Sequence, residues 1–426
     1  MAKGKRWFKL DNAAKLYPAI STDRWSSTFR VSAELNEPVD PARLQQAADR
    51  VMPRFPSLMV RMRTGLFWYY LEEIKSPLRV QEDTGHPCMP FRYHQDHGYL
   101  MRIRYYRNRI SAEFFHSLTD GSGGFVFLKT LAAEYLRLGG ADVACENGAL
   151  DPAEPPDPRE TRDAFLDMPL PKVRISRKEG RAYHFPGTRE IPHTLHTIAA
   201  SIPCAPLKAQ AKAAGATVTE FLVSVMLLCA AEDQASRPRR RLLPVRVSVP
   251  VNMRAFYPSP TVRNFSSFVN PGFDPRLGDC PFDEIVREVR AYMAYQVNPR
   301  LLSATIATNV ADEKNLLIRL VPLALKNLVI SSIFRKAGDK LVTATLSNLG
   351  VAKMPRGMEK HVRRFEFQLG VPSAPLYNCA CVTTGDEMRL VFSGNIREPT
   401  LPREMLSFLV EQGIPVEVES NLEEEG

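Results

Sequence analysis

The chain has 426 residues, of which 44% are hydrophobic and 24% charged. This is the composition of a globular protein, and at about 150 residues per domain it predicts two or three domains or lobes. The 22 Phe and 13 Tyr exclude a chain that is disordered throughout. The net charge of +9 is a mild excess that fits an anionic small ligand, an acidic carrier protein or an anionic surface. The basic runs lack interleaved aromatic residues, which argues against nucleic acid as a partner.

The sequence shows no sign of secretion, of a membrane span or of a metal site. Its N-terminal basic residues are not followed by an apolar core, so we expect no secretory signal. The longest apolar run, 221–231, is about half of what a bilayer span requires. The seven cysteines are scattered, and the spacing of Cys379 and Cys381 matches no zinc or redox motif. We therefore expect a cytoplasmic protein without a transmembrane segment or metal, and leave peripheral membrane contact open.

The first 140 residues alternate between strand and helix patterns. Asp40 is a plausible N-cap for a helix that has Pro41 at its first position and ends near Pro53. A second helix is predicted over about 123–138, where apolar residues recur on one face. Alternating or continuous apolar runs predict strands at 25–35, 66–72, 99–106 and 110–115.

Residues 139–192 differ from what precedes them, because they combine many prolines with mixed charges. Such a segment is typical of a long surface connection. We therefore place a boundary here, between an N-terminal lobe of 1–192 and a C-terminal lobe of 193–426.

The C-terminal lobe again mixes both patterns. Thr217 and Glu220 supply capping chemistry for one of its helices. Strands are predicted at 193–202, 243–250, 341–346, 362–369, 378–384 and 388–394. Helices are predicted at 206–214, 217–232, 281–296 and 316–335. Residues 416–426 are predicted to be a frayed acidic tail.

The segment 114–124 carries the clearest chemical signal. A predicted strand delivers His116 into a tight turn, Asp120 follows four residues later, and a glycine-rich stretch opens the next helix. Histidine has an ordinary pKa near neutrality and therefore suits general-base catalysis. Three structural readings compete: a core histidine bonded to the backbone, Asp120 as a simple N-cap, and the glycines as a phosphate cradle. The cradle is disfavoured, because the Lys-Ser/Thr ending of a P-loop is missing.

This His-x-x-x-Asp-Gly turn resembles the signature of CoA-dependent acyltransferases related to chloramphenicol acetyltransferase. That superfamily includes non-ribosomal peptide condensation domains, plant acyltransferases, alcohol acetyltransferases and polyketide-associated acyltransferases. Three further segments resemble landmarks of the group and occur in the same order: 249–254, 263–265 and 345–350. The resemblance spans nearly the whole chain. It implies an α/β fold of two lobes, each a mixed sheet flanked by helices, with an active-site channel between them.

The resemblance also implies roles for individual residues. His116 would be the general base, and Asp120 would orient the motif by pairing with Arg254, for which a bidentate contact is suited. Ser347 and Asn348 would be candidate donors to an oxyanion or to the channel. Solvated or turn-forming roles remain open for Arg254, Ser347 and Asn348. Supporting positions in the motif segments are Gly121, Asn252 and Asn264.

The sequence favours a standalone enzyme similar to the alcohol-acetyltransferase and polyketide-associated branch. Many relatives carry two adjacent histidines, whereas Phe115 stands in the first position here. The implied co-substrate is acyl-CoA or acyl-phosphopantetheine, with an acyl carrier protein as a candidate partner. The implied acceptor is a small-molecule or lipid hydroxyl, and we expect a monomer with no permanently bound cofactor. The alternatives are an amide-forming, condensation-type enzyme and a catalytically silent protein of the same fold that binds CoA or a carrier.

Overall fold

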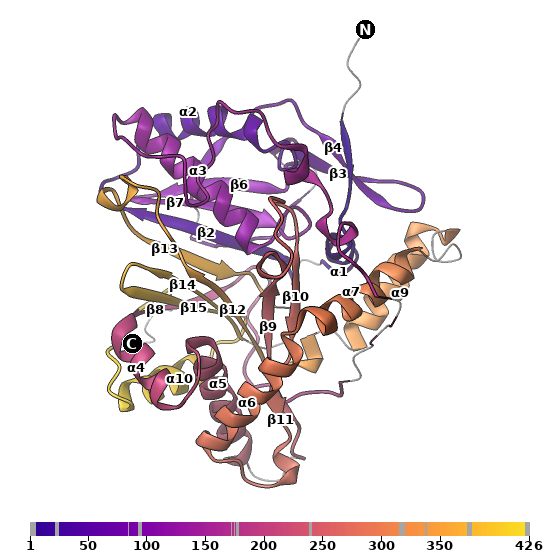
Figure 1. The fold of residues 1–426 in the computed structure, drawn as a ribbon, viewed down its shortest axis with the longest axis vertical. Helices are drawn as coiled ribbons and strands as arrows, with labels where there is room; N and C mark the ends of the chain where they lie inside the picture. Colours follow the sequence, from indigo (N-terminus) through magenta and orange to yellow (C-terminus); the bar gives the residue numbers. More distant parts are fainter. Residues whose placement is uncertain are drawn as a thin grey trace.

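The architecture comes from a computed structural model of the chain, which places two layered lobes one above the other (Figure 1). The structure describes residues 6–21, 25–83, 85–92, 96–171, 173, 175, 179–237, 241–314, 320–336, 339–372 and 377–421.

The first lobe is built on a five-stranded mixed sheet in the order β13-β2-β7-β6-β5. Its pairings are antiparallel except for β5 with β6, which is parallel. The strands are β2 (Thr28–Leu35), β5 (Val80–Glu82), β6 (Met101–Tyr106), β7 (Arg109–Phe115) and β13 (Val362–Leu369). Helices α2 (Pro41–Val51) and α3 (Gly121–Leu138) cover its outer face (Figure 1).

The second lobe is built on an eight-stranded mixed sheet, whose main path is β10-β9-β12-β14-β15-β8-β16, while β11 pairs with β9. The strands are β8 (His196–Pro203), β9 (Val245–Asn252), β10 (Ser266–Val269), β11 (Gly272–Phe273), β12 (Ala344–Val351), β14 (Tyr377–Thr384), β15 (Glu387–Gly394) and β16 (Glu417–Ser420). The helices packed beneath this sheet are α4 (Cys204–Ala213), α5 (Val218–Ala235), α6 (Phe282–Gln296) and α10 (Thr400–Glu411) (Figure 1). The two sheets confirm the predicted fold class of two mixed sheets flanked by helices.

A smaller antiparallel sheet extends the first lobe on one side. It consists of β1 (Trp7–Lys9), β4 (Tyr69–Glu73) and β3 (Val60–Thr64), in the order β1-β4-β3. Helices α1 (Leu16–Ile20), α7 (Pro299–Lys314) and α9 (Leu323–Lys336) lie on the same side of the molecule (Figure 1). The backbone N–H of Leu323 donates to the carbonyl of Leu66 at 2.9 Å, which ties α9 to the hairpin between β3 and β4.

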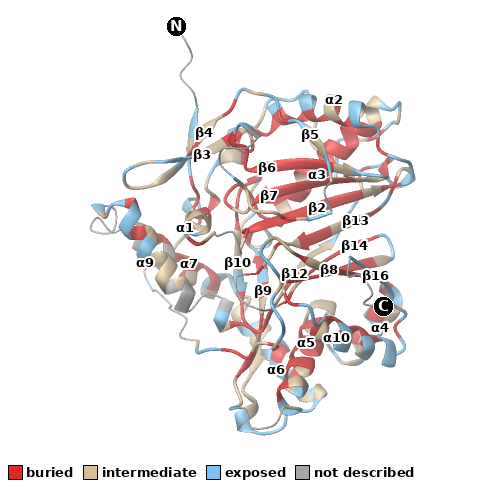
Figure 2. Cartoon of the chain, turned by 180° about the vertical axis from the view of Figure 1, so that it is seen from behind, coloured by how far each residue is buried: buried red, intermediate tan, exposed pale blue. Residues whose placement is uncertain are grey.

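Each lobe has its own hydrophobic core, and β14 separates the two. Ala380 and Val382 pack in the core of the first lobe, whereas Cys379 and Cys381 pack in the core of the second. Successive residues of a strand point to opposite faces, so one strand serves both cores. Figure 2 shows the burial concentrated in the strands of both sheets and in α5. The cysteine pair is therefore explained by packing.

The sheets do not follow the predicted lobe boundary throughout. Strand β13 lies in the second half of the sequence, yet it pairs antiparallel with β2 and completes the first sheet. The division at residue 192 therefore needs this correction, because residues 362–369 return to the N-terminal lobe. A strand pattern indicates which residues alternate, but not which neighbour they join.

The predicted frayed tail is also corrected, as far as the described residues reach. Glu417–Ser420 forms β16, which pairs antiparallel with β8. The carboxylate of Glu419 lies 3.1 Å from Arg364 and 2.5 Å from Arg389, whose side chains are almost fully buried. Buried cations require anionic partners, so this acidic segment is held on the sheet. Residues 422–426 lie outside the described part of the chain.

The helices of the second lobe were predicted incompletely. The predicted helix 316–335 corresponds to α9, which begins at Leu323, and residues 315–319 lie outside the described part. Helices α7 and α10 were not predicted. Within the described residues no single helix is both long and apolar enough to cross a bilayer; α4 and α5, bent by 76° at their break, reach that length and apolar content only as a pair.

Candidate active site

The turn after β7 positions the motif histidine by backbone contacts. The N–H of His116 donates to the carbonyl of Ser27 at 2.8 Å, and the N–H of Leu118 donates to the carbonyl of Phe115 at 2.9 Å. Phe114 and Phe115, at the end of the strand, are buried. Helix α3 begins at Gly121, so the strand–turn–helix prediction is confirmed.

A cavity of about 290 Å³ lies where the two lobes meet, and His116 lines it. Residues from both halves of the sequence share its wall. Six of the predicted site residues line it: His116, Asp120, Gly121, Asn252, Ser347 and Asn348. Arg254 and Asn264 contact this group through hydrogen bonds from the second lobe. The structure therefore brings all eight predicted residues together.

Two aromatic rings hold the imidazole of His116. The ring of Tyr17 stacks on it, with 4.5 Å between the ring centroids and an interplanar angle of 14°. The ring of Phe29 meets it edge-on at 5.3 Å. Burial lowers the pKa of His116, because it removes water from the charged form. The imidazole is therefore held in one orientation, and its neutral form is favoured.

Asn264 determines which nitrogen of His116 carries the proton. The amide Nδ2 of Asn264 donates to the backbone carbonyl of His116 at 2.9 Å, so Nδ2 must be the group on that side. The amide oxygen Oδ1 then lies 3.1 Å from Nδ1 of the imidazole and accepts a hydrogen bond from it. The proton is thereby assigned to Nδ1 by the network of partners. The other nitrogen, Nε2, then carries no proton and, among the described residues, has no hydrogen-bond partner, so it can accept a proton.

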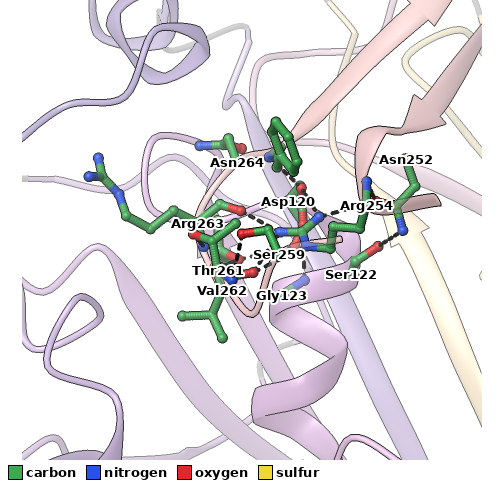
Figure 3. A network of polar contacts seen from close by, with 12 residues as sticks. Asp120, Ser122, Gly123, Asn252, Arg254, Ser259, Thr261, Val262, Arg263 and Asn264 are labelled. Carbon is green, nitrogen blue, oxygen red and sulfur yellow. Dashed lines mark hydrogen bonds and ion pairs between the residues drawn. The ribbon is translucent and has the colours of Figure 1, made fainter. Parts of the chain in front are cut away.

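Asp120 is fully occupied by structural contacts. Its Oδ1 accepts the N–H of Gly123 at 3.0 Å and so caps α3. Its Oδ2 accepts from Arg254 at 2.8 Å and from the backbone N–H of Phe265 at 2.8 Å (Figure 3). These bonds join the first lobe to the second. The N-cap reading and the ion-pair reading of Asp120 therefore both hold.

Arg254 is fixed mainly by backbone carbonyls. Its guanidinium donates to the carbonyl of Thr261 at 2.9 and 3.1 Å and to that of Arg263 at 2.6 Å (Figure 3). Its contact with Asp120 joins one nitrogen to one oxygen, so the expected bidentate pair is wrong. The reason is that the other guanidinium nitrogens, Nε and Nη2, donate to the carbonyls of Thr261 and Arg263 and are directed away from the carboxylate.

The remaining predicted residues differ in how free they are to contact a ligand. Asn348 donates from Nδ2 to the hydroxyl of Thr219 at 3.0 Å and accepts from the N–H of Gly350 at 2.7 Å, so it braces the end of β12. Asn252 donates to the hydroxyl of Ser122 at 3.2 Å, which links β9 to the start of α3. Ser347 lines the cavity beside them.

Gly123 is required by the close approach of the two lobes. A Cβ at this position would lie 2.1 Å from the carbonyl oxygen of Val262 and 2.3 Å from the hydroxyl of Thr119. We expect Gly123→Ala to lower the free energy of unfolding by about 1–3 kcal/mol or more, since the added methyl must displace backbone. Thermal unfolding measures this. Gly180→Ala is the control, because a Cβ there meets no atom of the described residues within 4 Å; equal stability losses in both variants would contradict the expectation.

The sequence-based reading missed the aromatic wall of the site. Tyr17, Trp25 and Phe29 all line the cavity. Phe29 lies in a strand whose alternation predicts an ordinary core residue, and no spacing connects Tyr17 to a histidine almost 100 positions later. Within the described part of the chain, no group of three or more His, Cys, Asp or Glu side chains could hold a metal ion.

Proteins similar to this chain are found among solved structures. No protein-family model matches the chain, and no curated protein sequence matches it. Among solved structures, polyketide synthase associated protein 5 from Mycobacterium tuberculosis is similar with a TM-score of 0.63 and 14% identity, covering 96% of this chain and 98% of that one. The first condensation domain of the CDA synthetase is similar with a TM-score of 0.59 and 17% identity, covering 96% of each chain.

A third similar structure is an acetyltransferase. The TRI3 trichothecene 15-O-acetyltransferase from Fusarium sporotrichioides matches with a TM-score of 0.61 and 9% identity, covering 96% of this chain and 94% of that one. The chain therefore has a fold similar to that of these three proteins. At these identities the likeness concerns the fold, and function is argued from the site.

Proposed function

We propose that the protein is an acyltransferase, which moves an acyl group from a thioester of CoA or of a carrier-bound phosphopantetheine to an acceptor hydroxyl, with His116 as the general base. The observation that carries this proposal is the state of the imidazole. Asn264 holds the proton on Nδ1, so the free Nε2 belongs to a side chain that lines a cavity shared by both lobes.

The site has the parts that the reaction requires. Nε2 of His116 accepts the hydroxyl proton as the acceptor oxygen attacks the thioester carbonyl, and a positioned base contributes about 10²–10⁴ in rate. The tetrahedral oxyanion needs a donor, for which the candidates are the hydroxyl of Ser347 and the second N–H of the Asn348 amide, whose first N–H donates to Thr219. When the intermediate collapses, the carbon–sulfur bond breaks and the leaving thiolate takes the proton from the imidazolium. The thioester is already activated for this exchange.

The cavity wall favours an apolar chain on at least one substrate. Apolar and aromatic side chains from both lobes contribute to it: Tyr17, Trp25, Phe29, Leu349, Phe367 and Leu369. Apolar surface is buried more favourably against such a wall than a polar group without partners. An acyl chain or a lipid alcohol fits this lining, and the net charge of +9 suits an anionic donor.

The proposal is tested by identifying the product. The protein is incubated with a panel of acyl-CoAs and pooled alcohols and amines, and products are identified by mass spectrometry. An ester supports the proposal. An amide as the only product would instead favour the condensation-type alternative, and CoA binding without any product would favour a silent binding protein. The same panel, offered as carrier-bound thioesters, distinguishes the two donor classes. A monomeric state and a cytoplasmic location stay predictions.

The pH dependence of the reaction follows from the burial of His116. A base is active when it is unprotonated, and burial lowers the pKa of this imidazole below its ordinary value of 6.5. We therefore expect kcat/KM to stay constant as the pH falls to that value and to decline only below it. A pH–rate profile of the free enzyme measures this limb. A decline centred well above pH 7 would contradict a buried, neutral base.

A further inference from the structure

A buried carboxylate lies behind Asn264. Asp11 has 0% of its surface exposed. Its Oδ1 accepts the N–H of Ala14 at 2.7 Å, its Oδ2 accepts Nδ2 of Asn264 at 3.2 Å, and the guanidinium of Arg263 lies 3.4 Å from Oδ2. Burial raises the pKa of Asp11, while Arg263 and the two N–H donors oppose that rise. Burying a charged carboxylate costs free energy unless it is paired and hydrogen-bonded. These contacts therefore indicate a role for Asp11 beyond local packing.

The contacts form a continuous row from the carboxylate to the imidazole. Asn264 donates from Nδ2 to Asp11 and accepts at Oδ1 from Nδ1 of His116, at 3.2 and 3.1 Å. We propose that Asp11 is a positioning residue for His116, acting through the amide of Asn264. The carboxylate orients this amide and stabilises the positive charge that the imidazole gains when Nε2 takes a proton. The role of Asp11 in catalysis rests on the proposed function, whereas the contacts from Asp11 to His116 do not depend on it.

No proton has to cross the amide in this arrangement. Both hydrogens of Nδ2 stay on nitrogen, one directed to Asp11 and one to the carbonyl of His116. The proton gained at Nε2 leaves on the thiolate, and Nδ1 keeps its own. The effect of Asp11 is therefore electrostatic and orientational, and linked hydrogen bonds of this kind reinforce one another in a low-dielectric interior.

Other charged groups face the same region and must be separated from Asp11 in a test. Asp120 is a second anion near His116, but its oxygens are engaged with Gly123, Arg254 and Phe265. Burial and the neighbouring Asp11 raise the pKa of Asp163 to about 6, so it titrates in the same interval as a histidine. Among the described residues, Lys15, Tyr17, Asp120 and Arg263 are further titratable or charged groups near Asp11, His116 or Asp163, and Arg254 pairs with Asp120.

The test is a titration of the imidazole itself. The full chain is labelled with ¹⁵N-histidine, the His116 signal is assigned by its loss in His116→Gln, and its midpoint is followed with pH. The variants are Asp11→Asn, Asn264→Ala and the double variant. Loss of the anion should lower the His116 midpoint by about half a pH unit, since the charge acts across an intervening amide. If part of the effect of Asp11 passes through Asn264, removing Asp11 should shift the midpoint less in the Asn264→Ala background than in the wild type.

Two controls exclude less specific explanations. Asp83→Asn removes a carboxylate that is also buried and paired with an arginine, at 2.6 Å from Arg30, but is not among the residues that line the cavity of His116. Asp163→Asn removes the other group that titrates near pH 6. Both should leave the His116 midpoint closer to the wild type than Asp11→Asn does. Circular dichroism shows whether each variant folds, and Asn264→Ala serves as the test if Asp11→Asn does not.

The activity assay gives a second readout. We expect Asp11→Asn to lower kcat and to move the acid limb of kcat/KM to lower pH, by about the half pH unit expected for the midpoint of His116. Unchanged midpoints in both single variants, or shifts that simply add in the double variant, would overturn the proposal. A wild-type protein that transfers no acyl group would refute the proposed function alone, because the NMR titration would still decide the role of Asp11.

Discussion

Replacing His116 by alanine is expected to abolish most of the acyl transfer while the protein stays folded. His116 lines the cavity and its Nε2 is the proposed base, and removal of a positioned base costs about 10²–10⁴ in rate. The loss should appear in kcat with a smaller change in KM, because Nε2 interacts more strongly with the proton that is transferred in the transition state than with the bound substrate. Steady-state kinetics with the best donor and acceptor measures both constants.

His361→Ala is the matched control for this prediction. His361 lies just before β13, in the first lobe, and is not among the residues that line the cavity. We expect it to keep the wild-type rate. Equal rates for His116→Ala and the wild type would remove His116 as the base, whatever the substrate.

Replacing Asp120 by alanine is expected to give the largest loss of stability at the site. One carboxylate caps α3, receives the N–H of Phe265 and pairs with Arg254, so its removal leaves three donors without their partner. Leaving a buried charge unpaired costs about 3–5 kcal/mol. Thermal and denaturant unfolding measure the loss, and activity should fall with it because the turn that carries His116 loses its bonds to Arg254 and Phe265 of the second lobe.

The conservative variant separates the cap from the charge. Asp120→Asn keeps an acceptor for Gly123 and removes the negative charge, so it should lose less stability than Asp120→Ala. Combined with Arg254→Met, a double-mutant cycle isolates the ion pair, and the two changes should be strongly non-additive because the groups touch at 2.8 Å. Additive losses would show that the pair contributes little across the lobes.

The motif was predictable because its signals are local. A strand, a histidine, an N-cap aspartate and glycines within ten residues dictate a strand–turn–helix, and the structure has it. The contact between Asp120 and Arg254 followed from the resemblance alone, since 134 positions separate the two residues. The contacts of Asn264 with His116 and Asp11 span 148 and 253 positions. No periodicity encodes such contacts, because they arise only when the lobes pack.

The bounds of a strand or helix were predictable where its own residues carry the pattern that defines it. Strand β13 was predicted with its observed bounds, but its membership of the first sheet depends on a pairing with β2 that alternation does not specify. Strand β16 escaped detection because its residues are exposed and acidic, and it is held by Arg364 and Arg389 from other strands. Helix α10 could have been found, since Leu401, Met405 and Leu409 recur at helical spacing and are buried.

The most direct test of the account measures free thiol released from a panel of acyl-CoA and carrier-bound thioesters, with and without pooled alcohols and amines, for the wild type and His116→Ala side by side. The account predicts release that requires an acceptor hydroxyl and falls by about 10²–10⁴ in the variant. Release of equal rate in both proteins, or no release from any donor, would contradict a base-catalysed acyl transfer at His116.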